Sequence, residues 1–204
     1  ALLLAGILGI ICAAAGAVFS PWLLDIMSVP EEVRAGSLIY CRIYFGGIWA
    51  MILYNMMAGV LRAFGDSKKP LYVLVVCSVV NIVVDLILVG LMHTGVGGAA
   101  AATVLSQIVS VVLTAYFLVK SDFLEEKIGI RTMRICKEHM GMMINKGFPL
   151  ALQSMLFPIA NSIVQASINT MGTDSIAAWG ICDKLDLLIW LIADSMGQIG
   201  RAHV

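Results

Sequence analysis

Four long stretches of this sequence contain no charged side chain: residues 1–24, 43–61, 99–119 and 147–173. A helix needs about 20 mostly apolar residues to cross the hydrocarbon core of a bilayer, and each stretch is about that long. Charged residues make up only 13% of the chain, against about 25% in soluble domains, so a surface this poor in charge favours lipid as its solvent. The stretches are too long, and lack the alternation, for membrane β-strands. The sequence therefore predicts an all-α polytopic membrane protein.

Two further apolar stretches carry charges within them. Residues 71–90 contain Asp85, and residues 176–196 contain Asp183, Lys184, Asp186 and Asp194. With these two, the sequence predicts about six transmembrane helices. The net charge is zero, so nothing indicates a nucleic-acid partner, and no cluster of residues indicates a cofactor, a resident metal or an enzyme's catalytic set.

The basic residues predict the orientation of these helices. Arg62, Lys68 and Lys69 lie in one connection, and residues 120–146 form a second basic connection, whereas residues 91–98 contain neither Lys nor Arg. Short basic connections stay in the cytoplasm, so residues 120–146 are expected to form a basic cytoplasmic loop. Its apolar residues recur at helical spacing, which predicts an amphipathic helix that lies on the inner leaflet or packs on protein.

Asp85 is the one charged residue within its predicted span, residues 71–90. A carboxylate in mid-helix costs roughly 2.5–3.5 kcal/mol on insertion scales, and such residues usually face a bundle interior and carry ions or protons. Asn81 lies four residues earlier on the same helical face. Asp85 and Thr103 lie about 7 Å and 6 Å from the outer ends of their spans, so these neighbouring antiparallel helices are expected to bring them face to face.

Asn55 is predicted to join these residues near the membrane centre. Asp85, Asn81, Thr103 and Asn55 would together supply carboxylate, amide and hydroxyl oxygens, which hard cations such as Na⁺ prefer. A proton would need Asp85 alone, provided that burial shifts its titration. The alternative is that these polar groups only form hydrogen bonds between helices.

A second polar group lies in the last span. Asp183, Lys184 and Asp186 are candidates for a substrate cavity, because Lys184 would partly neutralise the carboxylates; a solvated helix end is the alternative. Pro158 is expected to kink the fifth span, and such kinks line transport cavities or reflect irregular packing.

Several segments resemble the MATE (multidrug and toxic compound extrusion) transporters. Residues 59–70 read Gly-Val-Leu-Arg-Ala-Phe-Gly-Asp-Ser-Lys-Lys-Pro and are similar to the turn between the family's fourth and fifth helices. Residues 81–85 (Asn-Ile-Val-Val-Asp) resemble its fifth helix, residues 95–106 the start of its sixth, and residues 147–149 (Gly-Phe-Pro) its seventh. Residues 184–186 (Lys-Leu-Asp) look like a motif of one bacterial branch.

The resemblance implies a two-lobe, twelve-helix transporter, of which this chain would be a fragment covering about helices 3 to 8. Residues 1–119 would then be four helices of the N-terminal lobe, residues 120–146 the loop between the lobes, and residues 147–198 the start of the C-terminal lobe. It implies export of organic cations or drugs in exchange for Na⁺ or H⁺, by a monomeric multi-pass protein of the inner (plasma) membrane. Asn81, Asp85 and Thr103 match family positions implicated in cation binding, and Asn55 matches less closely.

Two departures accompany the resemblance. Phe157 stands where some family members carry a Glu, so coupling through that Glu is not expected. Residues 199–204 depart from the family pattern and match the translation of a sequencing-adapter segment, so they are expected to be a non-native tail. A lipid-linked oligosaccharide flippase of related architecture is the alternative function; it would need a cationic cavity for pyrophosphate, and these spans contain no cluster of Arg.

Overall fold

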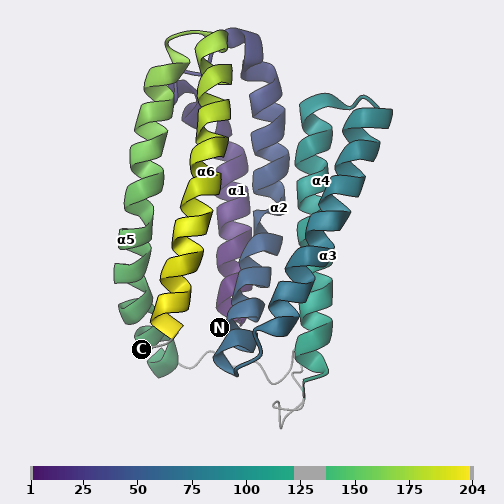
Figure 1. Cartoon of the computed structure of the whole chain (residues 1–204), viewed down its shortest axis with the longest axis vertical. Helices are drawn as coiled ribbons and strands as arrows, with labels where there is room; N and C mark the ends of the chain where they lie inside the picture. The colour runs from purple at the N-terminus through teal and green to yellow at the C-terminus, as the bar shows by residue number, and fades with distance from the viewer. Residues whose placement is uncertain (1, 122–136, 203–204) are drawn as a thin grey trace.

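A computed structural model describes residues 2–121 and 137–202, with side chains described for residues 2–121 and 140–191. All the regular elements of the described residues are helices, so the predicted all-α fold is confirmed (Figure 1). These are α1 (Leu2–Ile26), α2 (Glu31–Ala63), α3 (Lys68–Asp85), the π-helix η1 (Leu86–Leu91), α4 (Gly95–Val119), α5 (Lys137–Asn169) and α6 (Thr173–Ala202).

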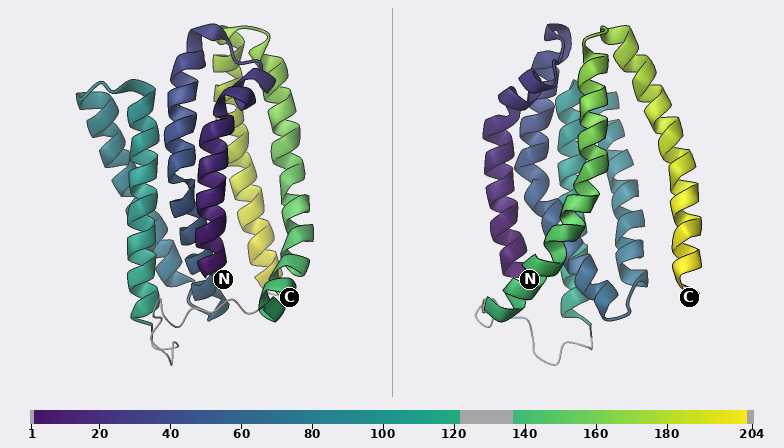
Figure 2. Two further views of the ribbon diagram at one scale, coloured as in Figure 1. Left: turned by 180° about the vertical axis from the view of Figure 1, so that it is seen from behind. Right: turned by 90° about the vertical axis from the view of Figure 1, so that its left-hand side faces the viewer.

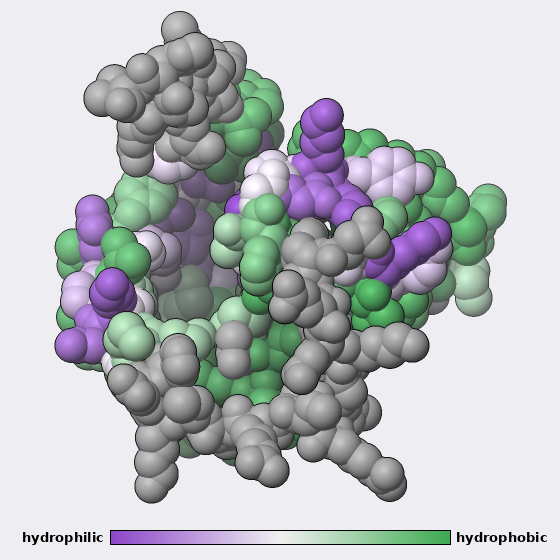
Figure 3. All heavy atoms as spheres, turned by 90° about the horizontal axis from the view of Figure 1, so that it is seen from below, coloured by the Kyte–Doolittle hydropathy of each residue, from purple (hydrophilic) through white to green (hydrophobic). Residues whose placement is uncertain are grey.

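The helices alternate in direction along one common axis. The start of α1, the end of α6 and the α2–α3 turn lie at the lower end in Figure 1, while the α1–α2 and α5–α6 turns lie at the upper end. The lower end carries Arg62, Lys68 and Lys69 and is called the basic end below; the upper end is called the outer end. Figure 3 views the basic end, where hydrophilic side chains gather in patches between hydrophobic flanks.

Helices α1 to α4 pack against one another in the spatial order α1, α2, α4, α3. The predicted contact between residues 71–90 and 99–119 is confirmed, because α3 and η1 both pack on α4. Helices α5 and α6 form a separate pair beside them (Figure 2). The division into lobes and a non-native tail stays a prediction.

Five of the helices are long and apolar enough to cross a membrane, among the residues described: Leu2–Ile26, Glu31–Ala63, Lys68–Leu91, Gly95–Val119 and Met140–Asn169. Only 11% of the most apolar window of α1 is buried within the protein, so most of its apolar surface faces outward, as lipid contact requires. The sixth predicted span lies within α6. It is not among these five helices, because Asp183, Lys184 and Asp186 make this part of α6 too rich in charge.

The start of α5 differs from the prediction. The fifth span was expected to begin at residue 147, but residues 137–146 are helical and continuous with it. The predicted amphipathic helix thus partly becomes the first turns of α5, and its remainder lies outside the described residues. Met143 is exposed and lies across a hollow from α2, so both alternatives for this segment stay open.

Small residues set the spacing between α2 and α4. A Cβ atom added to Gly47 would overlap the side chain of Val104, whereas one added to Gly46 would meet no atom within 4 Å. Close approach of helices at small residues is the usual packing mode in membranes. Gly47 therefore fixes how near α4, with its polar side chains, lies to α2.

This pair of glycines provides a matched test of that packing. We expect Gly47→Ala to destabilise the protein by about 1–2 kcal/mol, because overpacking against the stiff Val104 side chain outweighs the gain in helix propensity. Gly46→Ala should stabilise it by up to about 1 kcal/mol, since alanine favours a helix and meets nothing there. Unfolding in detergent measures both, and equal effects would contradict this account.

Candidate functional site: two polar cavities between helices

Asp85 lies where α3 changes into the π-helix η1. The hydrogen bond from Met92 N to Ile87 O (2.9 Å) spans five residues and closes this wider turn. Such π-turns are rare and often occur at functional sites. Asp85 is half-buried, and its Oδ1 atom is fully buried with no hydrogen-bond partner in the described chain. A carboxylate oxygen in that state is costly unless a cation, a proton or water satisfies it.

A polar cavity of about 250 Å³ lies between α2, α3 and α4. Two of the predicted ligands, Asn81 and Thr103, line it together. Asp85 lies one helical turn, about 6 Å, beyond Asn81 toward the outer end and is not among the lining residues. The remaining lining residues are Tyr54, Leu74, Cys77, Ser78, Ser106, Gln107 and Ser110.

Asp85 has an aromatic neighbour that the sequence did not indicate. Tyr40 of α2 lies close enough to interact electrostatically with the Asp85 carboxylate, and its ring stacks on Tyr44 at 5.9 Å between centroids. Two further polar atoms, Tyr54 Oη and Gln107 Oε1, are buried without a hydrogen-bond partner in the described chain. No motif marks these residues, since only the packing of α2 on α4 brings them to the cavity.

Asn55 is placed away from the other predicted ligands. It is exposed, its Nδ2 donates to Met51 O at 2.9 Å, and it lines a hollow of about 550 Å³ that reaches Met143 of α5. Successive helical residues point about 100° apart. Tyr54 therefore faces the cavity between α2, α3 and α4, while Asn55 faces α5.

A second cavity, of about 560 Å³, lies between α5 and α6. Asp183 and Asp186 both line it, because residues three apart share a helical face. Phe157 and Trp190 stack there at 6.5 Å between ring centroids, and Asn161, Trp179, Leu187 and Ile189 complete the lining. This cavity combines two carboxylates with three aromatic rings.

The other two residues predicted for this region are not part of that lining. Lys184 lies on α6 between the two acidic positions, about 100° around the helix from Asp183. Pro158 lies inside α5, and its carbonyl oxygen accepts a hydrogen bond from Ser162 Oγ at 2.8 Å. Phe157, noted in the sequence as replacing a Glu, is the α5 residue that supplies an aromatic wall.

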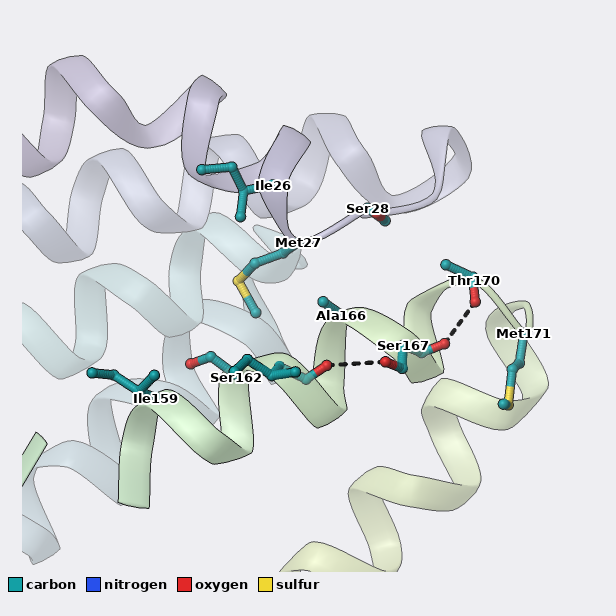
Figure 4. A pocket seen from close by; sticks show the side chains of 10 residues that line it. Ile26, Met27, Ser28, Ile159, Ser162, Ala166, Ser167, Thr170 and Met171 are labelled. Atoms are coloured by element: carbon teal, nitrogen blue, oxygen red, sulfur yellow. Dashed lines mark hydrogen bonds between the residues drawn. The ribbon is translucent and has the colours of Figure 1, made fainter. Parts of the chain in front are cut away.

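A further hollow, of about 640 Å³, separates the outer ends of α1 and α5 (Figure 4). Met27 points across it toward α5, from which Ser162, Ser167 and other side chains line the opposite wall. Asn169 closes the outer end, since its Nδ2 donates to Met27 O at 2.7 Å and its Oδ1 accepts from Gln165 Nε2 at 2.9 Å. Asn169 is the one buried residue among the described side chains of α5 and α6.

The turn at the basic end is held by Asp66. Its Oδ2 lies 2.8 Å from Lys69 Nζ, and its Oδ1 accepts from Lys69 N at 3.2 Å. These two hydrogen bonds from Lys69 lower the pKa of Asp66 below its ordinary value. Gly65 precedes it with a φ of 85°, a conformation that favours glycine. The Gly-Asp pair of this turn thus has a structural role at the start of α3.

Known proteins support the resemblance seen in the sequence. The profile of the MatE family matches residues 1–87. Over 94% of this chain, the sequence is 31% identical to "Probable multidrug resistance protein YoeA" of Bacillus subtilis (strain 168), and the match spans 42% of that protein. The chain belongs to the MATE family. Over 96% of it, this MATE chain is also 30% identical to "Protein DETOXIFICATION 43" of Arabidopsis thaliana, covering 37% of that protein.

Solved structures show the same fold. A MOP superfamily transporter from Pyrococcus furiosus superposes with a TM-score of 0.77 at 26% identity, covering 92% of this MATE chain and 42% of the other. A MATE protein in a bent conformation gives a TM-score of 0.74 at the same identity and coverage. The chain thus spans about two-fifths of the length of these relatives, and it is a multi-pass membrane protein.

Proposed function

We propose that the protein to which this chain contributes exports organic cations or drugs in exchange for Na⁺ or H⁺. The observation that carries the proposal is the buried Oδ1 of Asp85, which has no partner in the described chain although it lies in an otherwise apolar span. Intramembrane carboxylates of this kind serve ion and proton movement. The names of the relatives, which include multidrug resistance and multidrug export proteins, support the same class of activity.

Asp85 is proposed to bind the coupling ion. A proton or Na⁺ would satisfy the buried oxygen and lower the cost of the charge. Asn81 and Thr103 lie on the inner side of Asp85 and offer an amide and a hydroxyl. Asn55 faces a different hollow, so we leave it outside the ion site and assign it to the surface toward α5. Ion binding would then bias the relative movement of the two lobes.

The cavity between α5 and α6 is proposed to contact the organic cation. Asp183 and Asp186 supply negative charge, while the stacked Phe157 and Trp190, with Trp179, offer aromatic faces. Cations bind over such faces with about 0.5–2 kcal/mol each. A flippase for a lipid-linked pyrophosphate would need cationic walls instead, so the charge of this lining favours the exporter.

The basic end is proposed to face the cytoplasm, since Arg62, Lys68 and Lys69 lie there. This orientation places the Asp85 site nearer the outer surface of the plasma membrane. The protein is further proposed to act as a monomer, as a transporter rather than an enzyme, with no resident cofactor.

Reconstitution tests the proposal. The protein at its full natural length would be placed in liposomes, Na⁺ and H⁺ gradients would be imposed separately, and movement of a fluorescent organic cation would be followed. We expect movement under one of the gradients, which would also identify the coupling ion. Folded protein that moves no cation under either gradient would overturn the proposal and direct the test to lipid-linked substrates.

A further inference from the structure

We propose that the cavity between α2, α3 and α4 is a hydrated passage, selective for proton donors and cations, that runs from the Asp85 region about 10 Å toward the basic end. What the passage carries rests on the proposed function. Its hydration and its selectivity rest only on the residues that line it.

Two buried atoms show that the cavity is made for polar contents. Tyr54 Oη and Gln107 Oε1 are buried, lack a partner in the described chain, and belong to lining residues. Buried polar atoms in native proteins are nearly always hydrogen-bonded to protein or to ordered water. The volume of about 250 Å³ exceeds several times the roughly 30 Å³ that a water molecule occupies in the liquid. Water molecules therefore fit the space, beside the two residues that carry these atoms.

The hydroxyl groups give the cavity a preference for cations. Thr103 Oγ1 donates to Ala99 O at 3.0 Å, Ser106 Oγ to Thr103 O at 2.8 Å, and Ser110 Oγ to Ser106 O at 3.0 Å. A hydroxyl that donates its only proton to its own helix offers just its lone pairs to the cavity. With Gln107 Oε1, these groups form a row of acceptors along α4. Such a row suits water protons, a hydrated proton or Na⁺, and the donors of Tyr54, Asn81 and Gln107 lie in the same lining.

The cavity is elongated along the helix axes. Along α3 the lining extends from Asn81 to Leu74, which is about 10 Å toward the basic end. Along α4 it extends over the same length from Thr103 to Ser110, because the two helices are antiparallel. Asp85 lies just beyond the outer limit of this lining. The acceptors thus lead from the coupling residue inward.

Cys77 offers a direct test, because it lines the cavity and is only 7% exposed. In the full-length protein with every cysteine except Cys77 replaced by Ala, among them Cys12, Cys41, Cys136 and Cys182, a small cationic methanethiosulfonate should modify Cys77 at least about tenfold faster than an anionic one of similar size. A variant that keeps only Cys12, which lies on α1 outside this lining, serves as the control and should show no charge preference.

Absence of modification, or equal rates with the two reagents, would contradict the proposal of a hydrated, cation-selective passage. This readout requires no transport. If the protein failed to export cations but Cys77 showed charge-selective modification, the proposed function would be contradicted and the proposal of a hydrated cavity would be supported.

Gln107 tests what the passage carries. In the full-length protein, Gln107→Leu keeps the size of the side chain but removes the acceptor, and we expect export to slow by roughly tenfold with unchanged affinity for the organic cation. Gln107→Glu keeps an acceptor oxygen and should retain most of the rate. Leu105→Ala, on the exposed face of α4, is the neutral control. An unchanged rate in Gln107→Leu would show that ions do not use this route.

Discussion

Asp85→Asn should weaken binding of the coupling ion by roughly 10- to 150-fold, which corresponds to the 1.5–3 kcal/mol of a hydrogen bond to a charged group. The substitution keeps the shape of the side chain but removes the charge from Oδ1, the buried atom without a partner. It also removes the cost of holding a carboxylate in a membrane helix, so thermal stability should stay equal or rise. Loss of ion-driven export together with retained stability is the expected pair of results in the reconstituted full-length protein.

Glu32→Gln is the matched control, because Glu32 is exposed in the first turn of α2 and lines none of the cavities described above. Export by this variant should equal that of the parent. If Asp85→Asn exported as fast as the parent under the same gradient, Asp85 would not be the coupling residue. A loss of export accompanied by unfolding would instead assign Asp85 a role in stability, against the expectation above.

The double substitution Asp183→Asn and Asp186→Asn should weaken binding of a monovalent organic cation by about 10- to 100-fold. Both carboxylates line the cavity between α5 and α6, and each charge–cation contact near a partly wet surface contributes on the order of 1 kcal/mol or more. A neutral analogue of the same size should bind with nearly unchanged affinity, because Phe157, Trp179 and Trp190 remain. Titration of a fluorescent cation and its neutral analogue against the full-length protein gives both constants.

Asp174→Asn controls for the general loss of negative charge on α6, since Asp174 lies in its first turn and does not line the cavity. It should bind both ligands as the parent does. Equal weakening of cation and neutral analogue by the double substitution would indicate a collapsed cavity. Unchanged cation binding would place the substrate elsewhere.

The sequence predicted the membrane helices well because each one requires a mostly apolar run of a definite length. It placed Asn81 and Thr103 in one set of ligands, and both line the same cavity, since the short connection between α3 and α4 leaves these helices little freedom; the direct pairing of Asp85 with Thr103 stays a prediction. Asn55 was misplaced geometrically for a simple reason. Its depth follows from counting residues, but its direction around α2 depends on which face packs on α4, and that information lies in Gly47 and Val104 rather than near Asn55.

The lining of the cavities was harder to predict. Tyr40, Tyr54 and Gln107 are ordinary helix residues in the sequence, and only packing between distant segments makes them neighbours of Asp85 or of the polar cavity. The boundary of α5 was misjudged because the basic residues of 137–146 indicate a loop by charge while their apolar neighbours continue the helix. Asp183 and Asp186 were found because charges in an apolar segment are conspicuous, whereas their aromatic partners Phe157 and Trp190 were not.

The hydrogen bond from Asn169 to Met27 O has a mechanical consequence for α5. This helix has 33 residues and is about 50 Å long, and its one buried residue, among those whose side chains are described, lies at the outer end. Because α5 is held at its outer end, a tilt of about 10° around Asn169 would displace its other end by roughly 9 Å. The distance between spin labels at Met143 and Ala63 would change with such a tilt, while the distance between labels beside Asn169 and Met27 would stay nearly constant.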